Sequence, residues 1–401
     1  MSAKKLYRKI HLWLSVPFGI FITLICFSGS MLVFEKEITE LCRRDLYFVG
    51  QVGVAPLPLD RLMTSVAVTL PDSVSVTGVT FTPDPRRACR VSLSRPRHAS
   101  LYVDQYTGQI KGRSERLPFF DKMFRLHRWM MGSATGGGKL LVGTSTLMLV
   151  VILVTGLLMW LTNRNRPLAK SLKISFTKGW PRFWHDLHVA GGIYATVFLL
   201  ALALTGLTWS FSWYRTGFYK TLGVEVASGS PHGQSEAAAP ATRSEGAGRT
   251  EHGAEATGGV QRHRGEERAE REQPSAQTPY AHWQEVFGEL AARYPDYRQI
   301  TVSEGSASVV PVGRTSLRSG DRFDFDRRGR ITGCKPYVQQ ERAAKVRRGV
   351  YTVHVGSWGG VLTRILTCLA ALLGATLPLT GYYLWIRRLV KGHPHRRSAG
   401  A

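Results

Sequence analysis

Two long apolar segments, each beginning at a histidine, place the strongest constraint on this 401-residue chain. The first begins at His11 and reaches a Ser-Gly pair after seventeen and eighteen residues. The second begins at His188 and reaches a Thr-Gly pair at the same spacings. Eighteen helical residues span roughly 27 Å, close to the hydrocarbon thickness of a bilayer. Each segment therefore predicts one membrane helix with a histidine near one end and small residues near the other.

Two further apolar segments also match each other. Each contains the pattern T-G-x-x-x-W, and a cation precedes each threonine by sixteen residues, Lys139 in the first and Arg364 in the second. Another histidine lies upstream of each cation, His127 and His354. Because the spacings match in both types of segment, the chain reads as two copies of one unit. Each unit contributes two membrane helices and two histidines.

This pattern predicts a membrane α-helical protein, with a four-helix transmembrane bundle built from two parallel repeats. Two α+β domains are inserted on one side of the membrane. The predicted divisions are residues 1–34 (N-terminus and first span), 35–138 (first inserted domain and a pre-span helix), 139–162 (second span), 163–185 (loop), 186–214 (third span), 215–279 (linker segment), 280–357 (second inserted domain), 358–386 (fourth span) and 387–401 (basic tail).

The distribution of charge predicts the orientation. The net charge is +25, and residues 1–10, 163–185 and 387–401 together hold fifteen Lys or Arg and no Asp or Glu. Cytoplasmic segments next to membrane spans carry such an excess of basic residues. We therefore expect both termini in the cytoplasm and the inserted domains on the outer side of the membrane. A nucleic-acid partner is not expected, because these cationic segments adjoin the spans.

The inserted segments contain short alternating or β-branched runs between turn residues, as in small antiparallel sheets. The expected elements are a helix over 57–70, strands over 75–82, 88–94 and 100–103, a further strand at about 110, a short helix over 119–131 and a helix over 280–294. Residues 102–110 and 323–331 share a D-x-x-x-G-x-I-like turn, one residue shorter in the second case. Residues 228–277 have almost no large apolar side chains and predict a disordered linker.

The five cysteines occur without C-x-x-C or C-x-x-C-H, so covalent haem attachment and thiol relays are not indicated. Cys42, Cys89 and Cys334 fall in the segments expected on the outer, oxidising side, where pairing among them is left open.

Ionisable residues on membrane helices are candidates for function, because polar groups are costly at that depth. The repeat predicts that His11 faces His188 and that His127 faces His354. Two pairs of imidazoles stacked along a helix bundle are what two non-covalent, bis-histidine b-type haems require. We therefore predict two haem b cofactors, with these four histidines as iron ligands.

Three other residues belong to this hypothesis. His185 is an alternative to His188, because residues three apart share a helix face; only His188 has the spacing of His11. Lys139 and Arg364 are expected near the outer haem, where they either pair with its propionates or extend to the membrane interface.

The chain also resembles a known family. The stretches HLWLS, LHRWM, DLHVAGG and VHVGSWGG, with YVDQYTGQI and FDFDRRGRI, resemble PepSY-associated transmembrane proteins. This resemblance implies two periplasmic PepSY domains between four inner-membrane helices. It also implies relatives that include di-haem reductases of periplasmic ferric siderophores, and it maps the family's histidines onto His11, His127, His188 and His354. The long linker and His185 are departures from the family pattern.

The sequence thus predicts a membrane-bound, haem-dependent ferric reductase that passes electrons outward to a ferric siderophore or another ferric chelate. The 23-residue loop 163–185 is too short for a flavin or nicotinamide domain. The expected electron donor is therefore a membrane quinol or a separate reductase. The alternatives are a haem-free regulatory module that restrains an envelope partner, and a permease. The permease is less favoured, because the spans contain few polar residues.

Overall fold

The computed structural model describes residues 3–96, 99–133, 135–162, 172–225, 280–314 and 316–392. The predicted linker 228–277 and His98 lie outside the described residues. Four helical segments are long and apolar enough to cross a membrane, as predicted: Ala3–Leu32, Gly137–Leu161, Trp180–Ser210 and Ser357–Val390.

The spanning helices are longer than predicted. Helix α1 (Ala3–Leu32) begins well before the apolar segment, and α13 (Gly360–Gly392) continues past the predicted end of the fourth span at residue 386. The extensions are rich in Lys and Arg, which are good helix formers but not apolar. Hydropathy marks the part of a helix that suits the bilayer core, so it misses helical turns beyond that core.

The third span is interrupted. It consists of α8 (Trp180–Asp186), a π-helical turn η1 (Leu187–Gly191) and α9 (Gly192–Ser210). Single π-turns within α-helices occur often at functional sites. The sequence did not predict this turn, which contains His188.

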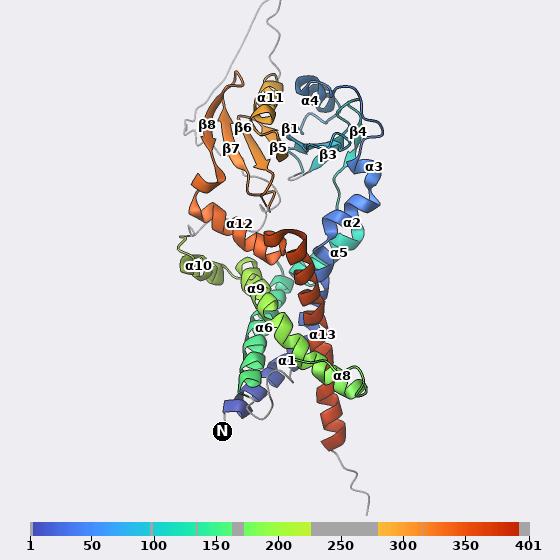
Figure 1. The fold of residues 1–401 in the computed structure, drawn as a ribbon, viewed down its shortest axis with the longest axis vertical. Helices are drawn as coiled ribbons and strands as arrows, with labels where there is room; N and C mark the ends of the chain where they lie inside the picture. The colour runs from blue at the N-terminus through green and yellow to red at the C-terminus, as the bar shows by residue number, and fades with distance from the viewer. Residues whose placement is uncertain are drawn as a thin grey trace, which may run out of the picture.

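The four spans form a closed bundle. Both α1 and α9 contact α6 (Gly137–Leu161) and α13, so α1 and α9 lie diagonally opposite each other. The N-terminal end of α1 and the C-terminal end of α13 lie at the end of the bundle away from the sheet (Figure 1). Buried apolar residues from all four helices fill the middle of the bundle: Ile22, Cys26, Leu149, Leu153, Ala195, Leu199, Ala203, Ala370 and Ala375.

Short helices precede the second and fourth spans. Helix α5 (Pro118–Trp129) packs against α1 and α6, and α12 (Arg342–His354) packs against α9. Left-handed residues break the chain after α5, at Met130 (φ 48°) and Met131 (φ 66°), and Gly356 (φ 72°) does so after α12. The short helix predicted over 119–131 is α5, which carries His127, whereas α12, which carries His354, was not predicted. Other connecting helices are α2 (Glu35–Cys42), α3 (Arg44–Tyr47), α10 (Ser212–Thr221), η2 (Tyr337–Gln339) and η3 (Ser357–Gly359).

The two inserted segments form a single antiparallel sheet of eight strands, in the order β4-β3-β2-β1-β5-β6-β7-β8. The strands are β1 (Val76–Phe81), β2 (Cys89–Leu93), β3 (Ser100–Val103), β4 (Ile110–Arg113), β5 (Tyr297–Ser303), β6 (Ser306–Pro311), β7 (Asp321–Phe325) and β8 (Ile331–Lys335). β1 and β5 join the two segments, and the hydroxyls of Thr80 and Thr301 lie 3.0 Å apart across this junction. Pairing satisfies backbone groups that would be unpaired at the edges of two separate sheets.

One apolar core serves both halves of the sheet. Helices α4 (Leu59–Val68) and α11 (Trp283–Arg293) lie at the end of the molecule farthest from the bundle (Figure 1). Their buried side chains pack with those of the strands in one cluster, which includes Leu62, Met63, Val66, Val79, Val91, Val103, Trp283, Val286, Leu290, Ile300, Val302, Val309 and Phe323.

The two predicted turns share their construction. The carboxylate of Asp104 accepts hydrogen bonds from two following backbone N–H groups, and that of Asp326 does the same. In each turn a glycine then adopts positive φ, 75° at Gly108 and 74° at Gly329. All five cysteines are free thiols.

The junction of the sheet can be tested by crosslinking. We expect the double variant Thr80→Cys/Thr301→Cys to form a disulfide on mild oxidation, because these residues are direct partners on β1 and β5. A specific protease site inserted between residues 228 and 277 would cut the chain between the two halves. Non-reducing gel electrophoresis should then show one band for the double variant and two fragments for either single variant. Two fragments in the double variant would contradict a continuous sheet.

Candidate functional site

The four predicted histidines lie in two pairs, one at each end of the bundle. The ring centres of His11 and His188 are 6.3 Å apart, and those of His127 and His354 are 6.1 Å apart. These are the pairs that the repeat spacing predicts. The two levels are separated along α1 by the rise between His11 and Gly29, roughly 27 Å.

Each pair joins opposite corners of the bundle. His11 lies on α1, and His188 lies in η1 at the start of the diagonally opposite helix. His127 comes from α5, beside α1, and His354 comes from α12, beside α9. Each half of the chain therefore supplies one imidazole to each level.

All four imidazoles are held in the same way. The Nδ1 atom of each ring lies within hydrogen-bond distance of a backbone carbonyl on a neighbouring spanning helix of the same half. The pairs are His11 with Ile152 (3.0 Å), His127 with Ile25 (2.9 Å), His188 with Leu377 (3.1 Å) and His354 with Leu202 (3.0 Å). A carbonyl oxygen can only accept, so Nδ1 carries the proton and Nε2 has a free lone pair. Histidines that bind metals are oriented in this way.

The sequence around each carbonyl explains why an imidazole fits there. Three residues after it comes Ser28, Thr155, Thr205 or Thr380, whose hydroxyl donates to that same carbonyl. The next residue is a glycine that faces the imidazole. A Cβ atom would come within 2.8 to 3.3 Å of the Cε1 atom of the ring at Gly29, Gly156, Gly206 and Gly381. The four Ser-Gly and Thr-Gly pairs therefore form the seats of the four imidazoles.

The His127–His354 pair, at the end of the bundle next to the sheet, is partly buried and neutral. Burial lowers the pKa of His127 and lowers that of His354 to about 3, so neither imidazole is protonated at neutral pH. The ring of Trp209 packs against His354, with the centres 5.0 Å apart. A neutral imidazole is the form that binds iron.

The ring separations fit a metal ion between the imidazoles. A nitrogen that binds a metal at about 2 Å, and lies about 1 Å from its own ring centre, places two opposed ring centres about 6 Å apart. Both measured separations have this value. No cluster of three or more metal-binding side chains occurs within the described part of the chain, so each level offers two protein ligands. This donor set suits a haem, whose macrocycle supplies the remaining ligands.

The structure distinguishes His188 from its alternative. The side chain of His185 is 44% exposed, and its Nδ1 lies 3.2 Å from the carboxylate of Asp186. It takes no part in the pair with His11. The π-turn adds a residue just where His188 must face inward, which is consistent with a turn that sets the direction of this side chain.

The two predicted cations lie in different settings. Arg364 forms an ion pair with Glu37 on α2, also donates to the carbonyl of Val33, and lies over the ring of Phe34. The hydrogen bonds from Arg364 lower the pKa of the Glu37 carboxyl. Within the described residues Lys139 forms no ion pair. A role for either cation beside haem propionates stays a prediction, and for Arg364 it requires exchange of the Glu37 contact.

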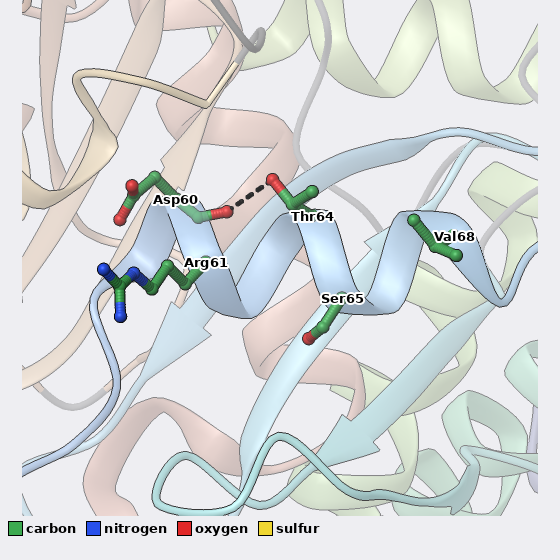
Figure 2. A pocket seen from close by; sticks show the side chains of 5 residues that line it. All are labelled: Asp60, Arg61, Thr64, Ser65 and Val68. Atoms are coloured by element: carbon green, nitrogen blue, oxygen red, sulfur yellow. Dashed lines mark hydrogen bonds between the residues drawn. The ribbon is translucent and has the colours of Figure 1, made fainter.

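The surface depression shown in Figure 2 lies elsewhere. Asp60, Arg61, Thr64, Ser65 and Val68 line it along one side of α4, at the end of the molecule remote from the histidines.

Sequence reasoning missed the carbonyl acceptors, Glu37 and the π-turn. The Ser-Gly and Thr-Gly pairs were the one sequence feature that could have located the carbonyl acceptors. In each case the hydroxyl residue and the glycine follow the acceptor residue by three and four positions.

Comparison with known proteins agrees with this architecture. The family model of the PepSY-associated TM region matches residues 8–388, which include all four histidines and both halves of the sheet. No curated protein matches the chain. Because the match covers nearly the whole chain, this protein belongs to the PepSY-associated TM region family.

Proposed function

We propose that this protein is a di-haem b oxidoreductase of the bacterial cytoplasmic membrane. It would pass electrons to the periplasmic side, where a ferric chelate such as a ferric siderophore is reduced and Fe(II) is released. The observation that carries this proposal is the fourfold seat, in which each imidazole has its Nδ1–H fixed on a carbonyl and the rings are paired at 6.3 and 6.1 Å.

The role of the protein is to hold the two haems and to exclude water from the space between them. His11 and His188 would hold one haem, and His127 and His354 the other. Bound haem supplies the one-electron redox chemistry, so no acid or base side chain is needed at the acceptor. The apolar cluster in the middle of the bundle excludes water between the two levels.

Charge and fold together support the proposed orientation. The sheet lies at one end of the molecule, and the Lys- and Arg-rich first turns of α1 and last turns of α13 lie at the other (Figure 1). With those basic turns in the cytoplasm, the two halves of the sheet would be the two PepSY domains of a parallel repeat on the periplasmic side. The His127–His354 pair is then the outer one.

The donor would be a membrane quinol or a separate reductase. Each ferric ion takes up one electron, so one quinol, which loses two electrons and two protons, would reduce two ferric chelates. The quinone and both protons are then the products on the donor side.

A visible spectrum tests the proposal first. We expect detergent-purified protein to contain about two b-type haems per chain by pyridine haemochrome quantitation. The reduced-minus-oxidised signal should disappear on addition of a ferric siderophore. If the haem stays reduced, the proposed ferric substrate is wrong, but the proposal of an electron-transfer protein stands. Protein without haem, from cells that make it, would favour a haem-free regulatory module.

Single histidine variants test the pairing. We expect His11→Ala and His188→Ala each to remove one haem, and His127→Ala and His354→Ala each to remove the other, because a bis-histidine site loses one of its two protein ligands. The matched control is His185→Ala, three residues from His188, which should retain both haems. Two haems in any of the first four variants would contradict the assignment.

A glycine variant tests the seat independently of the ligands. In Gly29→Ala the new Cβ would lie 2.8 Å from Cε1 of His127, so the ring must move off the Ile25 carbonyl. We expect the outer haem to be lost or its spectrum to shift, with the inner haem unchanged. Gly349→Ala is the control, because a Cβ there meets nothing within 4 Å. Equal spectra for both variants would show that the seat does not position His127.

A further inference from the structure

A cluster of arginines and tyrosines lies between the sheet and the bundle, next to the outer histidine pair. Arg314 and Arg318 come from the β6–β7 loop, Arg322 from β7, and Arg347 and Arg348 from α12. We call these five residues, with Tyr337 and Tyr351, the basic cluster. Its position is where α12 crosses between the sheet and the membrane helices (Figure 1).

Contacts with the tyrosine rings hold the cluster together. The guanidinium of Arg318 lies 3.7 Å from the ring centre of Tyr351. Those of Arg314 and Arg348 lie 5.4 and 5.6 Å from the ring centre of Tyr337. The backbone N–H of Tyr337 donates to the carboxylate of Asp321, which fixes the start of η2. Three of the five arginines are therefore held against tyrosine rings.

The cluster concentrates positive charge. All five arginines are partly buried. Arg314, Arg322, Arg347 and Arg348 form no ion pair with any acidic residue that the structure describes. Burial lowers the pKa of Arg348, and the charges of Arg322, Arg347 and Arg318 lower it further. Arginine does not give up its proton at neutral pH, so an anion is the remaining way to neutralise this charge.

The cluster adjoins the outer histidine pair. Tyr351 precedes His354 by three residues on α12, a rise of roughly 4.5 Å. The opposite face of α12 is fixed, because Val346 and Val350 pack with Tyr219 of α10. An anion bound at the basic cluster would therefore lie within about one helical turn of the residue that holds the outer cofactor.

The other half of the chain has a related arginine–aromatic contact with an acidic partner. Phe124 has the same position relative to His127 that Tyr351 has relative to His354, and the guanidinium of Arg116 lies 4.2 Å from its ring centre. Arg116, however, forms an ion pair with Glu35. The guanidinium of Arg128 lies 5.6 Å from the ring centre of Phe124. The two halves thus share the arginine–aromatic contact, but in the first half one of the two arginines is neutralised by an ion pair.

We infer that the basic cluster is the docking site for the ferric chelate and that it selects chelates with net negative charge, such as carboxylate complexes. This inference rests on the proposed function, which makes the bound chelate the substrate, and it adds the chemical class of that substrate. Planar guanidinium groups bind carboxylates through two parallel hydrogen bonds, and the tyrosine rings hold them in place for this contact.

Binding of redox-inert complexes tests the site without any reduction. Full-length purified protein is dialysed against gallium(III) citrate, which is anionic, or against a gallium(III) trihydroxamate without negative charge. We expect the citrate complex to bind at least about tenfold more tightly, and its affinity to fall as salt is added. Equal affinities for the two complexes would overturn the inference.

Variants locate the site. Arg318→Gln and Arg348→Gln should each weaken gallium citrate binding about tenfold, while Arg348→Lys, which keeps the charge, should weaken it less. Arg327→Gln, in the exposed β7–β8 turn, is the matched control and should bind like the parent. Unchanged haem spectra verify that the variants fold. Citrate binding that is unaffected in both cluster variants, or weakened equally in the control, would overturn the inference.

The two proposals fail in different ways. If the protein reduces an uncharged ferric trihydroxamate but binds gallium citrate independently of the basic cluster, the reductase is supported and the anion site is contradicted. If the protein contains no haem but still binds gallium citrate through Arg318 and Arg348, the anion site is supported and the reductase is contradicted.

Discussion

The hydrogen bond from an imidazole Nδ1–H to a carbonyl within a membrane helix is the contact on which the rest of this structure depends. A helix carbonyl is normally occupied by the N–H four residues later and leaves one lone pair free. In this protein four such carbonyls each also accept an imidazole and a Ser or Thr hydroxyl. The contact is costly to break, because a buried imidazole N–H without a partner loses about 1 to 3 kcal/mol. It also fixes the tautomer, so it decides which nitrogen is available to a metal.

The glycine of each seat is a consequence of this contact. The ring must approach the helix closely enough to reach a backbone atom, and any side chain at the fourth residue after the carbonyl would stand in its path. The hydroxyl residue just before it is compatible with a buried, apolar surrounding only because its own donor is satisfied within the helix. Both small residues therefore follow from one requirement, which is the entry of an imidazole between membrane helices.

Much of this was accessible from the sequence, because it rests on spacings along single helices. The four spans and the pairing of His11 with His188 and of His127 with His354 follow from repeated intervals. The strands of the first inserted segment follow from alternating or β-branched runs. The carbonyl acceptors were not predicted, because every residue has a backbone carbonyl and residue type does not show which one accepts a hydrogen bond. The ion pair of Arg364 with Glu37 depends on where α2 turns after the first span. The single sheet depends on pairing of β1 with β5, and edge strands and internal strands have similar sequences.

The sheet and the outer histidine pair belong to one mechanical unit. The edge strands β4 and β8 lead directly into the segments that contain α5 and α12, and these helices carry His127 and His354. The distance between the outer imidazoles is therefore constrained from both edges of one continuous sheet, which the β1–β5 junction closes in the middle. Two separate sheets could move independently and leave this distance to the membrane helices alone. The inner pair has no such frame and depends on the spans and the π-turn, so the two levels differ in how their geometry is fixed, although their seats are alike.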